Sequence, residues 1–313
     1  MKKIILVLAM LLCSMTACVK DVEFDGEQSD PLLVVNGVQQ VGRPANLCVE
    51  KSWFFLDSKT DLRVKDLEVD LYVNGSFKES LQVRDTISPL WDYFYTYCEG
   101  QYELCEGDQL RFELRSSEFE TAYAEVTLPV SPTIISFDTV SVDLDYGIAE
   151  FAVVIDDPVG ADFYNLYFYN SIETEYSDYS FYSSDPVFAD PMDLGADDLM
   201  GESTDYLGSG LYNVFTDTYF DGRTYTVNFT YYFWDIEALE PFVIEMSRVD
   251  EHLYKYKKTY EKYQGSDPNG VLGMFTEPVQ VYSNVQNGVG IVSGQSKPVV
   301  MTVDIMGNKK LNK

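Results

Sequence analysis

The stretch Leu67-Glu68-Val69-Asp70-Leu71-Tyr72-Val73-Asn74-Gly75-Ser76-Phe77 decides the fold class. Its apolar residues alternate with polar ones up to Val73, which is the period of a β-strand with one buried face. The Asn74-Gly75 dipeptide favours a tight turn in which both central residues have positive φ. Phe77, Leu81 and Val83 continue the apolar positions at even spacing. We therefore predict a β-hairpin with one buried face.

Similar short apolar runs lie on both sides of this hairpin. Turn residues separate them, and Pro129 and Pro132 bracket the point where the series ends. Roughly seven or eight short strands in about 100 residues are typical of an immunoglobulin-like sandwich. We therefore predict such a domain over residues 31–130. The other strand candidates are residues 32–35, 45–51, 93–98, 101–105, 109–114 and 121–128.

The remainder, residues 131–313, also reads mainly as strands. One helix is predicted at 247–264, because Ser247-x-x-Asp250 resembles a capping box and Gly265 suits a helix end. Its apolar stripe comprises Met246, Val249, Leu253, Tyr256, Tyr260 and Tyr263. The predicted fold class is mainly β, with an N-terminal immunoglobulin-like sandwich followed by a second β-sandwich-like domain that carries this long amphipathic helix. The strand candidates are residues 133–142, 148–155, 163–170, 211–216, 224–233, 278–282, 289–293 and 299–305.

Residues 1–17 have the pattern of a secretory signal peptide. Lys2 and Lys3 precede the apolar run 4–12, which is too short to span a bilayer. The ending Met15-Thr16-Ala17-Cys18 resembles the lipobox of bacterial lipoproteins, although Leu is commoner than Met at its first position. This resemblance implies that Cys18 is acylated and becomes the first mature residue. The alternative is ordinary secretion with Cys18 unmodified.

An acidic tether, residues 18–30, follows the cysteine. Its Lys20 and subsequent acids resemble the surface-export signal of Bacteroidetes lipoproteins. That resemblance implies a protein anchored by lipid in the outer membrane and facing outward. The same composition is also that of a plain disordered tether.

The charge distribution is strongly uneven. The 313 residues carry a formal net charge of −29, and the segment Ser116–Gly222 contains 22 acidic residues and no Lys or Arg. Such a field repels nucleic acid and anionic lipid headgroups and attracts cations or basic partners. The alternative interpretation is that the acids keep a surface protein soluble.

Three cysteines, Cys48, Cys98 and Cys105, lie in the part expected to fold. An odd number allows at most one bridge within the chain. Cys98 and Cys105 could pair across neighbouring strands, or all three could be small buried hydrophobes. No Cys-x-x-Cys pair is present, which argues against a thiolate zinc site.

Two segments of the second region are candidates for binding. The aromatic stretch 163–182 combines Tyr with Ser and Asp, a mixture typical of adaptable contact surfaces; the alternative is a strand with an aromatic face. The long segment 183–210 lacks periodicity, and its acids could ligate calcium, although no EF-hand pattern is present. The ligand-contact candidates are Tyr164, Tyr167, Tyr176, Tyr179 and Tyr182, and the metal-ligand candidates are Asp193, Asp197, Asp198, Glu202 and Asp205.

The sequence gives little support for catalysis. His252 is the single histidine, and we expect it on the surface or flank of the predicted helix. A Ser-His-Asp hydrolase would have to depend on it alone. Acidic residues are so abundant that no pair of them indicates a glycosidase. We expect no enzymatic activity and no cofactor apart from possible calcium.

The C-terminal segment 275–291 is the most distinctive, and it contains Phe275-Thr276-Glu277-Pro278 and Asn287-Gly288-Val289-Gly290. It resembles the closing motif of a Bacteroidetes lipoprotein family described as a domain of unknown function. An aromatic residue is usual in that family where Val292 stands. Further matches are Leu33-Val34-Val35-Asn36-Gly37, Asp157-Pro158-Val159-Gly160 followed by Tyr164, and Tyr254-Lys255-Tyr256.

Genes of this family often lie beside genes for TonB-dependent outer-membrane receptors. The family has no established catalytic residues, so the resemblance implies none in this chain. The resemblance therefore implies a non-catalytic binding or accessory lipoprotein of such an uptake system, with a TonB-dependent receptor as its partner. The alternative is a structural or adhesive surface lipoprotein whose acidic region binds calcium or a basic partner.

Overall fold

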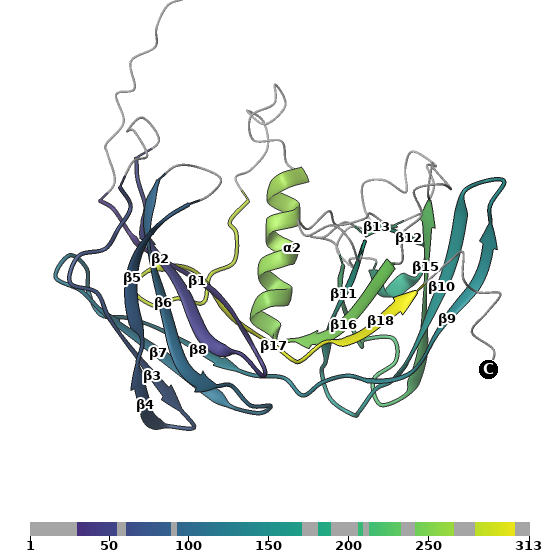
Figure 1. The fold of residues 1–313 in the computed structure, drawn as a ribbon, viewed down its shortest axis with the longest axis horizontal. Coiled ribbons are helices and arrows are strands. Elements are labelled where there is room, and N and C mark those ends of the chain that lie inside the picture. Colours follow the sequence, from purple (N-terminus) through teal and green to yellow (C-terminus); the bar gives the residue numbers. More distant parts are fainter. Residues whose placement is uncertain are drawn as a thin grey trace, which may run out of the picture. The chain divides into compact units, whose positions relative to one another are not determined.

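The computed structural model describes residues 30–54, 61–88, 93–170, 181–188, 206–208, 213–232, 242–265 and 279–303. The chain divides into two compact units, Met1–Asp30 and Pro31–Lys313. The described residues are mainly β-strands and include one α-helix (Figure 1), which confirms the predicted fold class. In this described part, no helix has the length and apolar character needed to cross a membrane.

Eight strands precede residue 130, and they form most of the first sandwich. One layer is the four-stranded sheet β4-β3-β7-β8, and the other contains β1, β2, β6 and β5. Their inward residues, such as Leu47, Leu71 and Phe112, form a continuous buried core. The strands are β1 (Leu33–Gln40), β2 (Pro44–Lys51), β3 (Glu68–Val73), β4 (Ser76–Ser80), β5 (Gln82–Ile87), β6 (Phe94–Glu103), β7 (Gln109–Arg115) and β8 (Ala122–Thr127).

The predicted hairpin is present, but its second half differs from expectation. Val73 pairs with Ser76, and Asn74 and Gly75 have φ of 52° and 79°, as the primed turn requires. The even spacing of Phe77, Leu81 and Val83 predicted one buried face. Only Leu81 is buried, because the chain changes sheets there and β4 is an edge strand.

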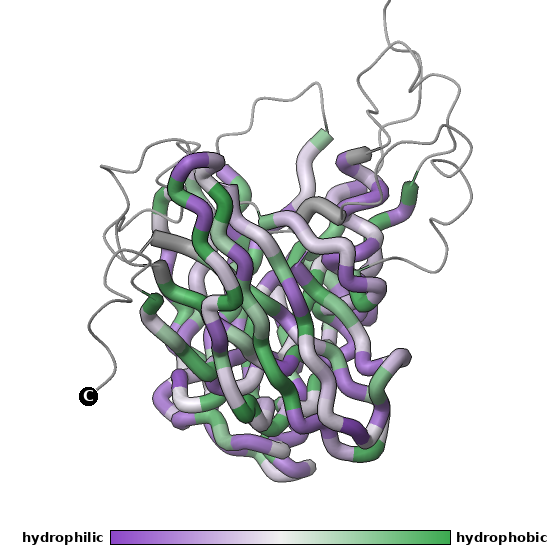
Figure 2. Tube along the Cα trace, turned by 90° about the vertical axis from the view of Figure 1, so that its right-hand side faces the viewer, coloured by the Kyte–Doolittle hydropathy of each residue, from purple (hydrophilic) through white to green (hydrophobic). Residues whose placement is uncertain are grey.

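The second sandwich has its own core. The five-stranded sheet β13-β12-β15-β10-β9 faces β14, β11, β16 and β18, and aromatic side chains such as Phe151, Phe168 and Phe229 fill the space between. Figure 2 views the side on which β9 and β10 lie in Figure 1, where hydrophobic and hydrophilic residues alternate along the strands. The elements are β9 (Thr133–Asp143), β10 (Ile148–Asp156), β11 (Phe163–Asn170), β12 (Phe181–Ser183), the 3-10 helix η1 (Pro186–Phe188), β13 (Tyr206–Gly208), β14 (Val214–Thr216), β15 (Thr224–Tyr232), β16 (Phe242–Val249), α2 (Glu251–Gly265), β17 (Val289–Gln295) and β18 (Val299–Val303).

The helix begins later than the predicted start at residue 247. Ser247 lies in β16 and α2 begins at Glu251, so the proposed Ser247-x-x-Asp250 capping box is wrong. The cap is Asp250, whose Oδ1 accepts a hydrogen bond from Leu253 N at 2.9 Å. Met246 and Val249 belong to the strand because β16 pairs with β11 there, at Leu166↔Met246 and Phe163↔Val249. A spacing of three puts the two side chains on opposite faces of β16, and both are buried.

The last part of the chain completes the first sandwich. β17 pairs in parallel with β1 over seven positions, from Val34↔Val289 to Gln40↔Gln295. Val285 and Val292 are buried in the first core. The predicted domain boundary near residue 130 stays a prediction. The described structure has two cores, and the first also includes residues from the C-terminal part of the chain.

A narrow strand connection joins the two halves of the nine-stranded sheet. β16 and β17 share one paired position, Val249↔Gln295. Asp250 N donates to Gly294 O at 3.0 Å, and Ser296 N donates to Arg248 O at 2.8 Å. The sheet order is β14-β11-β16-β17-β1-β2-β6-β5, with β18 paired to β16.

The three cysteines among the described residues form no bridge. Cys48, Cys98 and Cys105 are all free thiols, with Cys98 buried and Cys105 exposed. Of the two alternatives for Cys98, the structure therefore shows the small buried hydrophobe. Burial raises the pKa of both the Cys48 and the Cys98 thiol to about 12, and the Glu50 carboxylate contributes at Cys48.

Candidate functional site

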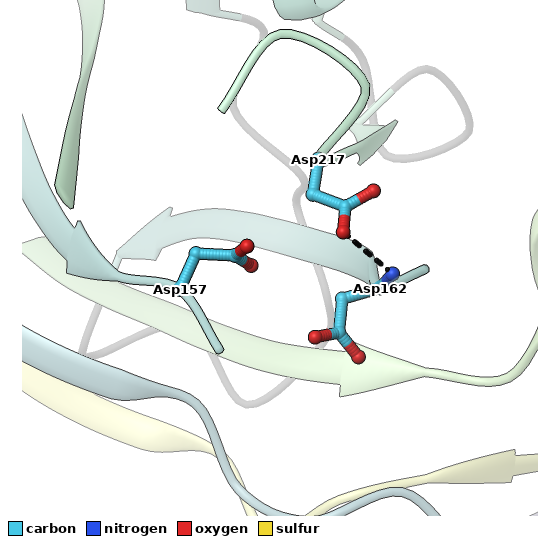
Figure 3. Close-up of side chains that lie close together, drawn as sticks. All are labelled: Asp157, Asp162 and Asp217. Carbon is cyan, nitrogen blue, oxygen red and sulfur yellow. Dashed lines mark hydrogen bonds between the residues drawn. The ribbon is translucent and has the colours of Figure 1, made fainter. Parts of the chain in front are cut away.

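Three buried aspartates meet at one end of the second sandwich. Asp157 directly follows β10, Asp162 directly precedes β11, and Asp217 directly follows β14. The three come together because β11 pairs with β14 at Phe163↔Thr216, next to the last two aspartates. One carboxylate oxygen from each lies within 4.8 Å of the others, and the Asp157 side chain points toward the other two (Figure 3).

Hydrogen bonds fix the position of Asp157. Its Oδ1 accepts a hydrogen bond from the buried Tyr164 hydroxyl, and its Oδ2 accepts one from Gly222 N at 2.9 Å. Gly222 has φ of 67°, which glycine adopts without strain. The Asp157 carboxylate therefore ties the end of β10 to β11 and to the turn before β15.

Backbone hydrogen bonds connect Asp162 and Asp217 in both directions. Asp162 N donates to Asp217 Oδ2 at 2.9 Å (Figure 3), and Asp217 N donates to Asp162 O at 3.2 Å. The Asp162 carboxylate also forms an ion pair with Arg248 of β16. These contacts place four charged side chains at the junction of β10, β11, β14 and β16.

The electrostatics of this cluster are unbalanced. Burial, together with the charges of Asp157 and Asp221, raises the pKa of Asp217 to about 6. Arg248 is the cation that pairs with the cluster, and burial lowers the pKa of its guanidinium. When all three carboxylates are ionised, one guanidinium leaves two negative charges in a partly dehydrated space.

This arrangement suits a hard divalent cation better than it suits catalysis. Calcium binds six to eight oxygen atoms, mostly from carboxylates and carbonyls, whereas zinc prefers His and Cys. Asp157, Asp162 and Asp217 offer oxygen ligands alone. With Tyr164 and Gly222 already bonded to Asp157, the cluster also holds four strand ends in place without any ion.

The family comparison agrees with the sequence. Residues 19–298 match the family described as Domain of unknown function (DUF4249). The chain belongs to this family. The match confirms the predicted assignment to a family of unknown function, and no protein with a curated description matches the chain.

Among solved structures, the chain is similar to bovine butyrophilin. The two share 10% sequence identity over 70% of this chain and 92% of that chain, with a TM-score of 0.20. At this TM-score the similarity supports no conclusion, and the fold of this DUF4249 member is defined by the sheets described above.

The predicted tyrosine surface is not brought together in the described residues. Tyr164 is fully buried, so its prediction as a surface ligand contact is wrong; the alternation along β11 turns it toward the second core. The Tyr167 hydroxyl accepts a hydrogen bond from Lys257 Nζ at 3.1 Å beneath α2. Tyr182, in β12 of the other sheet, is exposed, and its ring packs against that of Tyr232 with 4.9 Å between the ring centroids. Tyr176 and Tyr179 lie outside the described residues.

The predicted calcium ligands Asp193, Asp197, Asp198, Glu202 and Asp205 also lie outside the described residues. Sequence reasoning missed the Asp157, Asp162 and Asp217 cluster, because Asp217 is distant in sequence and acids are common throughout. One signal was available, since Asp157-Pro158-Val159-Gly160 followed by Tyr164 is among the segments that carried the family resemblance in the sequence.

His252 lies in the first turn of α2, on the predicted element. Its Nδ1 is 2.8 Å from the Tyr282 hydroxyl, and burial lowers the pKa of its imidazole. It lines a cavity of about 380 Å³ together with Tyr72, Gln109, Arg111 and Glu125. Glu125 accepts a hydrogen bond from Arg111 at 2.9 Å. The lining of this cavity thus includes an ion pair and an imidazole whose Nδ1 is within hydrogen-bond distance of a phenol.

Proposed function

We propose that this DUF4249 protein is a non-catalytic binding or accessory component of an outer-membrane uptake system, held at the cell surface by an acylated Cys18. The observation that carries the proposal is Met15-Thr16-Ala17-Cys18 preceding an acidic tether and a mainly β chain. Several acyl chains anchor a protein far more firmly than one, since each buried CH₂ contributes about 0.8 kcal/mol. The partner is a TonB-dependent receptor, which the family's gene neighbourhood supports.

Fractionation and co-purification test this proposal. The native chain is expected in the outer membrane, labelled by radioactive palmitate, and should bring down a receptor after mild detergent extraction. Cys18→Ser should abolish the label and release the protein, whereas the matched control Cys13→Ser should change neither. An unlabelled native chain, or a labelled chain that never brings down a receptor, would refute the corresponding half of the proposal.

A second candidate function is a structural or adhesive surface lipoprotein stabilised by calcium. The observation that favours it is the buried cluster of Asp157, Asp162 and Asp217, which carries two uncompensated negative charges when ionised. A cation bound to the folded state at about one hundred times its dissociation constant stabilises it by about 2.7 kcal/mol.

Thermal unfolding with and without calcium tests this second function. Millimolar CaCl₂ at pH 7.5 is expected to raise Tm by several degrees, and the increase should be smaller below pH 6, where Asp217 takes up a proton. Asp217→Asn should remove the response, and the exposed control Asp145→Asn should retain it. An equal calcium response in both variants would exclude the cluster as the site.

A further inference from the structure

The edge strand β9 has an unusual combination of features. It runs from Thr133 to Asp143 at the end of the five-stranded sheet, and among the described residues it pairs only with β10. Its pairing skips two residues. Ile134 and Ser136 face successive β10 residues, as do Thr139 and Ser141, which leaves Ile135 and Val140 as bulged residues.

Both bulged residues are apolar and exposed. Ile135 and Val140 each have 58% of their surface exposed. They lie about 15 Å apart at the rise of an extended chain. Bulges re-aim side chains and interrupt the regular edge. The strand therefore presents two aliphatic side chains to solvent and offers no long uninterrupted ladder for strand addition.

Further exposed apolar residues flank the strand at both ends. Val130 precedes β9, and Leu144 and Tyr146 follow it, all three exposed. Tyr146 is 80% exposed, which is unusual for a large aromatic residue. Exposed apolar side chains thus recur along this strand and at both of its ends, and we treat them as one candidate contact surface. We call the set Val130, Ile135, Val140, Leu144 and Tyr146 the β9 edge.

The charge around the β9 edge has one sign. No Lys or Arg occurs in any strand of the sheet β13-β12-β15-β10-β9, whereas β9 and β10 carry exposed Asp138, Asp143 and Glu150. The nearest basic residue after Arg115 in sequence is Arg223, before β15. In the described strands of this sheet, the apolar side chains therefore have acidic neighbours and no basic residue among them.

We propose that the β9 edge docks a protein partner whose surface has apolar pockets bordered by Lys or Arg. Charge complementarity selects this occupant: a second copy would bring Asp138 and Asp143 against the same acids, and an anionic lipid surface would be repelled. The inference deepens the proposed function by assigning the surface through which the partner is met. This inference rests on the part of the proposed function that gives the protein a binding partner, and it does not require that partner to be a receptor.

Site-specific photo-cross-linking in cells that naturally make the protein tests the inference. A photoreactive phenylalanine replaces Ile135 or Val140 in the full-length chain, with Phe77 and Val300 as matched controls, since both are exposed apolar residues on strands elsewhere. Positions 135 and 140 are expected to give the same protein adduct, and the controls none. Mass spectrometry of the adduct should identify a partner segment containing Lys or Arg.

Charge reversal supplies the second measurement. Combined Asp138→Lys and Asp143→Lys should lower the adduct yield at position 135 roughly tenfold, because Lys or Arg on the partner would then face like charges. The matched control is the double variant Glu103→Lys and Glu120→Lys, two exposed acids on the first sandwich, which should leave the yield unchanged. Adducts with a second copy or with lipid, equal adducts at the control positions, or no adduct at all would each overturn the inference.

The two proposals can fail separately. A receptor that co-purifies but cross-links from no position on β9 leaves the proposed function standing and refutes the β9 edge. A basic partner other than a receptor, cross-linked from Ile135 and Val140 and lost on charge reversal, would support the β9 edge and refute the receptor partnership of the proposed function.

Discussion

Replacement of Asp250 by asparagine is expected to stabilise the protein at alkaline pH and to leave it nearly unchanged in acid. Asp250 caps α2 through Oδ1, whereas its Oδ2 is buried and has no hydrogen-bond partner among the described residues. Burial raises the pKa of this carboxyl from 3.8 to about 7. The folded state therefore disfavours the ionised form relative to the unfolded state.

The sign and size of the effect follow from proton linkage. Because the folded pKa is raised, the contribution of Asp250 to stability is complete below about pH 4 and is lost as pH rises to about 7. Each pKa unit corresponds to about 1.4 kcal/mol, which gives an upper bound of about 4 kcal/mol. Relaxation of the site and the lost attraction between a carboxylate and the helix dipole reduce the expected gain to about 2 kcal/mol. Asparagine caps a helix about as well as aspartate does.

Urea unfolding followed by circular dichroism measures this effect. At pH 8 the unfolding free energy of Asp250→Asn should exceed that of the native chain by about 2 kcal/mol, and at pH 4.5 the two should nearly coincide. Glu251→Gln is the matched control, since Glu251 is the exposed neighbour paired with Lys255 at 2.8 Å. The reasoning is refuted if the difference between Asp250→Asn and the native chain is the same at both pH values.

Three further predictions concern other sites. Lys257→Met should lower the unfolding free energy by about 2–4 kcal/mol in urea titrations, because buried acceptors lose their donor. Lys257 Nζ lies 2.9 Å from Asn165 Oδ1 and 3.0 Å from Asn213 Oδ1. The control Lys255→Met, at an exposed position, should change the unfolding free energy little. Gly290→Ala should lower the unfolding free energy by about 3 kcal/mol or more, because the φ of Gly290 is +117° and an added Cβ would lie 2.2 Å from Val35 O. Gly107→Ala, where the added Cβ would enter open space, should lower the unfolding free energy by about 1 kcal/mol. A thiol reagent at pH 8 should label exposed Cys105 rapidly and Cys48 and Cys98 slowly, and persistence of the rapid phase in Cys105→Ser would contradict this.

Local signals in the sequence were sufficient where one force dominated. The Asn74-Gly75 turn was predictable because its φ values exclude most other residue pairs. The start of α2 was not, because Met246 and Val249 have helical spacing and only their pairing with β11 places them in β16. The cap, Asp250, is also held by the contact of its backbone N with Gly294 O. Strand alternation accounts for the burial of Tyr164, whereas the composition of the stretch 163–182 suggested a binding surface.

The candidate site depended on tertiary structure. Asp157 and Asp162 are near in sequence, yet Asp217 joins them only because β14 pairs with β11. Nothing in the spacing of abundant acids distinguishes these three from the rest. The two bulges of β9 were equally hidden, since Ile135 and Val140 fit an ordinary strand and become exposed only through the register with β10.

The pairing of β1 with β17 has a consequence for biosynthesis. Ile291 N donates to Asn36 Oδ1 across 255 positions of sequence, and Val292 occupies the core beside strands made far earlier. The portion synthesised first therefore cannot mature until almost the whole polypeptide has been delivered. During secretion the strand Leu33–Gln40 waits without its parallel neighbour, which favours slow folding and exposes an aggregation-prone edge. A premature stop codon anywhere before Val289 would leave the opening sandwich, rather than the terminus alone, unfinished.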